Sequence, residues 1–254
     1  MTPSDAEQPL YVRIADALKR QIGDGTLSEG DRVPSELKLA EAWGTTRPTV
    51  RQALDVLRGE GLITTQPTRG TFVRRRPTVE VRSSTRYHRR PPGEETSPFA
   101  RDARREGAEP SWLWDTKRIR ADARIADRLG IAPNDHVMQT SYTFRADERP
   151  VQTSVSWEPF ALVGGTDIEE PEGPGKIAGV IARMDSIGIA VDRVSELVRA
   201  RPATADERRQ LDIPEDIWVM TIERTYWTEQ QAVETSDITI PADRYALNYE
   251  IPIS

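Results

Sequence analysis

The chain contains no cysteine and only two histidines, His88 and His136. Without cysteine there are no disulfides, no thiolate zinc site and no cysteine nucleophile, and few ligands remain for a transition metal. No stretch approaches the roughly 18 uninterrupted apolar residues of a membrane span. The opening residues MTPSDAEQP lack the basic and apolar regions of a signal peptide. We therefore expect a cytoplasmic protein without metal, cofactor or membrane partner.

Charge, in contrast, is abundant and unevenly distributed. Of the 254 residues 30% are charged and 37% apolar, which is typical of a soluble chain with two modest domains. Residues 1–76 hold 12 basic and 10 acidic residues, whereas residues 111–254 hold 16 and 25. Between Arg69 and Arg90, eight arginines accompany the single acid Glu80. The net charge of −6 therefore conceals a basic strip in the N-terminal part.

Apolar periodicity in the first third predicts three helices. Apolar residues recur at the helical period from Leu10 to Ile22, and Gly23 ends this segment. Ser35 is a predicted cap of a second helix and Thr46 of a third. The turn between them, residues 43–45, has the spacing of a helix-turn-helix. Residues 61–66 and 71–74 then predict two short strands, so that the whole reads as a winged helix.

The third helix is predicted to present one polar face. Arg47 and Arg51, with Thr49 and Gln52 beside them, lie opposite the apolar positions Val50, Ala53, Leu54 and Leu57. Such a helix fits a DNA major groove, where arginine bonds guanine O6 and N7 in bidentate fashion. The alternative is an ordinary solvated helix face. The turn spacing, the cap and the basic wing favour DNA.

These segments resemble the DNA-binding domain of the GntR family of bacterial transcription regulators. The resemblance rests on SEXXLA from Ser35, TRPTVRQALDVLRGEGLI from Thr46 and RGTFV from Arg69. It implies operator contacts, and the residues we expect to bind DNA are Ser35, Thr46, Arg47, Thr49, Arg51, Gln52, Arg69 and Gly70. Many relatives have an arginine where this chain has Leu37, so the preferred operator is expected to differ.

Residues 77–97 are rich in proline and arginine and are predicted to be a linker between domains at 1–76 and 98–254. Two interpretations of the linker stay open: its arginines follow the DNA backbone, or it is a solvated tether. Beyond it the chain repeats itself at an offset of 82 residues, with eight identities such as Ser154 and Ser236 within 26 positions. Each copy reads as a helix followed by two strands, which predicts two related α+β units unless chance explains the match.

The repeated region resembles the UTRA domain, the effector-sensing module of the HutC-type branch, whose fold is shared with chorismate lyase. The resemblance implies an α+β fold class with an antiparallel sheet. Phosphosugar-sensing relatives hold phosphate with two arginines where this chain has Tyr142 and Phe144, so we expect an effector that is not a phosphosugar. The predicted effector-binding residues are Tyr142, Phe144, Ser154, Trp157, Glu234 and Tyr245. The aromatic residues among them are equally suited to an ordinary core.

Together these patterns predict a regulator, most simply a repressor, that binds double-stranded operator DNA as a homodimer and responds to a small molecule. One alternative is a ligand-independent repressor of plasmid or phage type, whose UTRA-like domain only dimerises. The other is an enzyme with a lyase-like second domain. No arrangement of acids and histidines indicates catalytic residues, so we expect no enzymatic activity.

Overall fold

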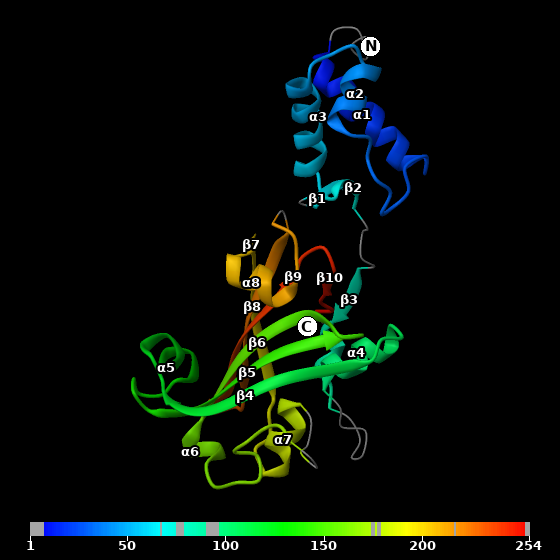
Figure 1. Cartoon of the computed structure of the whole chain (residues 1–254). Helices are drawn as coiled ribbons and strands as arrows, with labels where there is room; N and C mark the ends of the chain where they lie inside the picture. Colours follow the sequence, from blue (N-terminus) through cyan, green and yellow to red (C-terminus); the bar gives the residue numbers. More distant parts are fainter. Residues whose placement is uncertain are drawn as a thin grey trace. The chain divides into compact units, whose positions relative to one another are not determined.

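The computed structural model describes residues 8–66, 68–74, 79–89, 97–173, 176, 179–215 and 217–251 (Figure 1). The chain divides into two compact units, Met1–Pro77 and Thr78–Ser254. In the described part of the chain, no helix is both long and apolar enough to span a membrane.

The N-terminal unit is built on three helices: α1 (Leu10–Gly23), α2 (Glu36–Ala42) and α3 (Arg47–Gly59). The predicted periodicity is confirmed, because α1 buries Ile14 and Leu18 and α3 buries Val50 and Leu57 in one shared core. Full burial of such side chains contributes about 1.5–3 kcal/mol each. Helices too short to be stable alone are therefore held by their packing.

The two predicted helix caps differ in the structure. The Ser35 hydroxyl accepts a hydrogen bond from the backbone N–H of Lys38 at 3.3 Å, as a cap does. Thr46 lies at the cap position of α3, but its side chain makes no capping bond and instead lies 3.1 Å from the Thr49 hydroxyl. The expectation of a Thr46 side-chain cap is therefore wrong. The first turn of α3 also contains Pro48, whose missing N–H needs no cap.

The predicted wing is a hairpin of β1 (Ile63–Gln66) and β2 (Gly70–Val73). Gly70 has φ +114, and a Cβ at this position would lie 2.9 Å from Nε of Arg32. The backbone conformation therefore favours glycine here, whereas the flexible end of the Arg32 side chain could move away from a Cβ. This geometry places Arg69 at the exposed end of the hairpin.

The C-terminal unit is organised around a six-stranded antiparallel sheet in the order β4-β5-β6-β9-β8-β7. Its strands are β4 (Pro110–Arg120), β5 (His136–Ala146), β6 (Arg149–Pro159), β7 (Arg193–Pro202), β8 (Trp218–Trp227) and β9 (Ala232–Pro241). This confirms the predicted α+β class with an antiparallel sheet.

The strand order and register reproduce the sequence repeat. Helices α5 (Ala123–Leu129) and α8 (Ala205–Leu211) begin and end 82 residues apart. At the junction of the two halves β6 pairs with β9, and Val155 lies opposite Asp237, which is its own repeat equivalent. A pseudo-twofold axis therefore passes through this pair. Each helix packs on the other half, α5 against β9 and α8 against β6, so the two copies form one body.

The remaining elements of this unit are α4 (Pro98–Arg105), α6 (Phe160–Val163), α7 (Val180–Ser186), β3 (Glu80–Ser83), β10 (Tyr245–Asn248) and a 3-10 helix, η1 (Ser84–Tyr87). Helix α4 buries Phe99 against Ile238 of β9, and α7 buries Met184 against Tyr226 of β8. These helices and η1 lie on the face of the sheet opposite α5 and α8.

The described part of the predicted linker, residues 79–89, is packed, which corrects its interpretation as an unpacked tether, whereas contact of its arginines with DNA stays a prediction. β3 pairs in parallel with β10 at the end of the chain. Arg82 is 3% exposed, donates to the Gln152 amide oxygen at 2.6 Å and stacks on the Tyr245 ring. Arg86 and Arg89 form ion pairs with Asp102 and Asp185, so the three arginines of this segment have partners within the fold. The predicted linker residues 77–78 and 90–96 lie outside the described residues.

Candidate nucleic-acid interface and ligand cavity

The polar stripe of α3 points to solvent. The side chains of Arg47 and Arg51 are 61% and 57% exposed, and Gln52 is exposed beside them. Of the other residues expected to bind DNA, Ser35, Thr46 and Arg69 are exposed, and Thr49 and Gly70 are half-buried. The helices α2 and α3 and their caps contain Ser35, Thr46, Thr49, Arg51 and Gln52, whereas the wing contains Arg69 and Gly70. Their roles in DNA binding stay predictions.

The side chain of Glu36 contacts both arginines. From the sequence, this residue was interpreted only as a favourable charge at the start of a helix. Glu36, the first residue of α2, accepts from Nε and Nη2 of Arg51 at 3.1 and 2.9 Å, and from Nη2 of Arg47 at 3.2 Å. The hydrogen bonds from Arg51 lower the pKa of Glu36 below its usual value, so the carboxylate is charged at neutral pH. No local spacing could show this contact, because it joins two helices.

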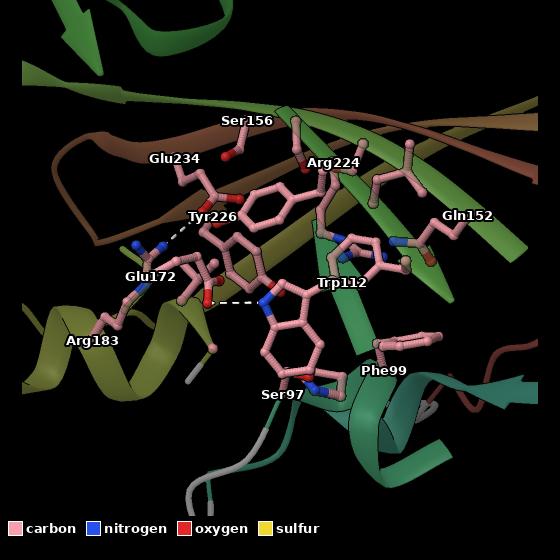
Figure 2. Close-up of a pocket in the computed structure, with 18 of the residues that line it drawn as sticks. Ser97, Phe99, Trp112, Gln152, Ser156, Glu172, Arg183, Arg224, Tyr226 and Glu234 are labelled. Carbon is pink, nitrogen blue, oxygen red and sulfur yellow. Dashed lines mark hydrogen bonds and ion pairs between the residues drawn. The ribbon is translucent and has the colours of Figure 1, made fainter. Parts of the chain in front are cut away.

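The second site is a cavity of about 110 Å³ between one face of the six-stranded sheet and α4, α7 and η1. In Figure 2, α7 brings Arg183 to one side of it, and Phe99 of α4 lies on another. Its walls are aromatic and polar, and they comprise Phe99, Trp112, Tyr142, Phe144 and Tyr226 together with Arg86, Gln152, Ser154, Ser156, Glu172, Arg183, Arg224, Glu234 and Ser236. This volume is below the roughly 300–1,000 Å³ of sites for drug-sized ligands, so the cavity as it stands suits only a compact molecule.

The structure places four of the six predicted effector residues at this cavity: Tyr142, Phe144, Ser154 and Glu234. Trp157 does not line it, because odd-numbered residues of β6 point to the other face, where Trp157 packs beneath α5. Tyr245 lies on β10 under the Arg82 guanidinium. The grouping of Trp157 and Tyr245 with the other four is therefore corrected. Effector binding by any of the six stays a prediction.

Sequence reasoning missed several cavity residues that the internal repeat indicates. Adding 82 to Tyr142, Phe144 and Ser154 gives Arg224, Tyr226 and Ser236, and all of them line the cavity. Because the pseudo-twofold axis relates the two halves, equivalent positions of both halves lie around this axis on the same face of the sheet. Arg86 and Arg183 have no such signal, because η1 and α7 lie outside the repeated segments.

Three arginines line this cavity, of which Arg183 is buried and Arg86 and Arg224 are partly buried, and each has an acidic partner. Arg86 pairs with Asp102 at 3.0 Å and Arg224 with Glu196 at 2.7 Å. Arg183 lies 2.6 Å from Glu158 and 3.3 Å from Glu234. Tyr142 and Phe144, which stand at the two positions where phosphate-binding arginines were not expected, place aromatic rings at the cavity. The cavity nevertheless contains cations, because three arginines line it.

The Arg183 cluster, defined as Arg183, Glu158 and Glu234, has two carboxylates for one guanidinium, and all three residues are at most 5% exposed. Figure 2 shows Arg183 reaching from α7 toward Glu234. Burial, and then repulsion from Glu158, raise the pKa of Glu234 to about 8. Glu234 therefore holds a proton at neutral pH. Burial also raises the pKa of Glu158, against the opposing effect of Arg183.

We expect this proton to make stability depend on pH. The pKa of Glu234 rises from 4.5 in the unfolded chain to about 8 in the folded unit, so the stabilisation is complete below pH 4.5 and is lost as pH rises through 8. The Glu234→Gln variant keeps an oxygen that accepts from Arg183 but has no proton to lose. The free energy of unfolding, which declines by at most about 1.4 kcal/mol per pH unit, should therefore decline less steeply in this variant. Urea unfolding between pH 5 and 8.5 measures it. Exposed Glu229→Gln is the matched control; equal slopes in both variants would contradict the assignment.

No cluster of three or more His, Cys, Asp or Glu side chains suited to a metal ion is found among the described residues. The cavity therefore offers an organic molecule three kinds of contact: aromatic faces, hydroxyl groups and the charged groups of the three arginine pairs.

Comparisons with known proteins identify both domains. The pattern of the bacterial regulatory proteins of the gntR family matches residues 10–73, and that of the UTRA domain matches residues 106–246. The chain is 31% identical to the HTH-type transcriptional repressor NagR of Bacillus subtilis, over 93% of this chain and 92% of NagR.

Solved structures give the same result. A crystal structure of a putative GntR-family transcriptional regulator is 37% identical, with a TM-score of 0.74, and the match covers 98% of this chain and 99% of that one. PhnF from Mycobacterium smegmatis shares the fold, at 21% identity and a TM-score of 0.58, over 95% of this chain and 100% of PhnF. The chain therefore belongs to the GntR family of bacterial transcription regulators, with an N-terminal helix-turn-helix domain and a C-terminal UTRA domain.

Proposed function

We propose that this regulator represses transcription by binding an inverted-repeat operator as a homodimer, and that a small molecule in the UTRA cavity modulates the binding. The exposed Arg47–Arg51 stripe of α3 is the observation that carries the proposal. A helix with this face can lie in the major groove, where its arginines reach guanine edges, while Arg69 of the wing reaches the backbone or minor groove.

Dimerisation is supported by the reach of a single recognition helix. One helix contacts only a few base pairs, whereas two related by a twofold axis contact both halves of a palindromic site. The UTRA sheet offers a surface for a second copy, since β4 is an edge strand and its Leu113 and Trp114 are 59% and 49% exposed. The two side chains project from opposite faces of this edge strand, and an edge strand with exposed apolar side chains favours association.

We expect Trp114→Glu to weaken the dimer, because it brings a charge into the proposed interface. Light scattering after size-exclusion chromatography should show the mass falling from two chains toward one at micromolar concentration. Ile251→Glu is the control, since Ile251 is 77% exposed and near the chain end. A Trp114→Glu protein that keeps the wild-type mass would place the interface elsewhere.

Effector binding is supported by buried donors that lack partners. Nη1 of Arg183 and Nε of Arg86 have no hydrogen-bond partner among the described residues. Buried donors of this kind are costly unless a ligand or water supplies an acceptor. Arg86 belongs to η1 of the C-terminal unit, so a ligand that supplies an acceptor to it would be held between η1 and the sheet.

Binding of the effector can be tested by thermal shift. Small molecules that raise the melting temperature of the wild-type protein should do so less for Tyr142→Ala, which removes one aromatic wall. Leu197→Ala, an exposed position on β7 that does not line the cavity, should respond as the wild type does. A response that survives in Tyr142→Ala would place the ligand elsewhere, and turnover of the ligand would indicate an enzyme.

The DNA-binding part of the proposal is tested by footprinting the purified protein on the DNA upstream of its own gene, at two salt concentrations. We expect protection of two half-sites one helical turn, or a multiple of it, apart. Protection should weaken at higher salt, because phosphate contacts release counterions. Uniform protection of any duplex would contradict sequence-specific binding.

A further inference from the structure

Glu36 connects the start of α2 to the two arginines of α3 that face solvent. Its carboxylate is 26% exposed, less than half the exposure of either arginine side chain. One carboxylate oxygen accepts from both arginines, and the other accepts from Nε of Arg51. The acid thus lies behind the arginines and ties both to the second helix.

The contact with Arg51 uses only one edge of its guanidinium group. A guanidinium has five N–H donors, arranged as a side edge of Nε and Nη2 and an end edge of Nη1 and Nη2. Glu36 occupies the side edge of Arg51. The end edge, whose Nη1 has no hydrogen-bond partner in the described part of the chain, has the two parallel donors that match guanine O6 and N7.

We propose that Glu36 is a specificity-determining positioning residue: it orients Arg51, and with it Arg47, so that their free donors face the bases of the operator. The inference rests on the proposed function. Long side chains lose rotamer freedom when they bind, and an arginine that is already oriented loses less. The carboxylate also repels phosphates, so that it disfavours contacts with the DNA backbone that any sequence would satisfy.

The test compares Glu36→Gln with Glu41→Gln, which removes the same charge from the same helix at an exposed position. Affinity is measured on the footprinted operator and on a scrambled duplex for each variant. We expect Glu36→Gln to reduce the ratio of the two affinities by about tenfold, because two side chains lose their orientation. Glu41→Gln should leave the ratio unchanged. If the ratio of operator affinity to scrambled-duplex affinity is unchanged in both variants, the inference is overturned. The proposed function would still stand in that case, provided that the wild-type protein prefers the operator.

A double-mutant cycle separates positioning from direct base contact, since a glutamate can also accept from cytosine N4. If Glu36 acts through the arginines, Glu36→Gln has no further effect on the ratio once Arg47 and Arg51 are alanine. A full effect in that background would show that Glu36 contacts the base itself and would overturn positioning. A wild-type ratio near one would overturn sequence-specific binding, and the inference with it.

Discussion

The Arg47→Ala, Arg51→Ala double variant is expected to lose most of its preference for operator DNA. Each arginine that contacts a base contributes about 1–3 kcal/mol of discrimination, so each substitution weakens operator binding by about one to two orders of magnitude. Both side chains are more than half exposed and outside the core, so their removal should not unfold the domain.

The measurement is a titration of operator and scrambled duplex with each single variant and the double variant. Base contacts predict a large loss on operator and a small one on scrambled DNA. Arg13→Ala, at an exposed position of α1, is the control for loss of positive charge alone. If the double variant loses equally on both duplexes, the arginines bind phosphate and the salt dependence should fall in proportion.

The winged helix could be predicted from the sequence because its signals are local. The periodicity of α1 and α3, the Ser35 cap and the turn at residues 43–45 each involve neighbours in the chain. The contact of Glu36 with Arg51 could not be predicted in the same way, since it depends on how α2 packs on α3. The Thr46 error has a similar origin, because a cap residue can satisfy its hydroxyl with another side chain.

The UTRA domain shows how far a repeat can carry a prediction. The 82-residue offset predicted paired units, and the register through Val155 and Asp237 shows that the repeat is also a spatial symmetry. Added to the number of Tyr142, the offset would have indicated Arg224 as another residue of the cavity. The arginines of residues 79–89 were misread because composition favoured a solvated segment, whereas alternation of Val79 and Val81 with Glu80 and Arg82 is a strand signal.

The Arg183→Met variant is expected to lose about 3–5 kcal/mol of the free energy of unfolding of the UTRA domain, because the buried Glu158 and Glu234 side chains would lose the cation that they share. Methionine retains much of the apolar stem, so the loss reports charge rather than a cavity. Urea unfolding followed by tryptophan fluorescence measures it. Arg199→Met is the control, since Arg199 is 57% exposed in its pair with Glu223 and surface pairs contribute at most about 1 kcal/mol.

A rescue variant makes the cause testable. Adding Glu158→Gln and Glu234→Gln to Arg183→Met removes both ionisable carboxyl groups and should restore much of the stability, since a buried ionic cluster replaced as a whole often costs little. The Arg183 cluster also faces the cavity, so a stable triple variant that fails to bind a ligand of the wild-type protein would show that the cluster serves recognition. If Arg183→Met is as stable as Arg199→Met, the two buried carboxyl groups do not depend on the Arg183 cation for their stability, and the assignment of Arg183 as their stabilising partner is wrong.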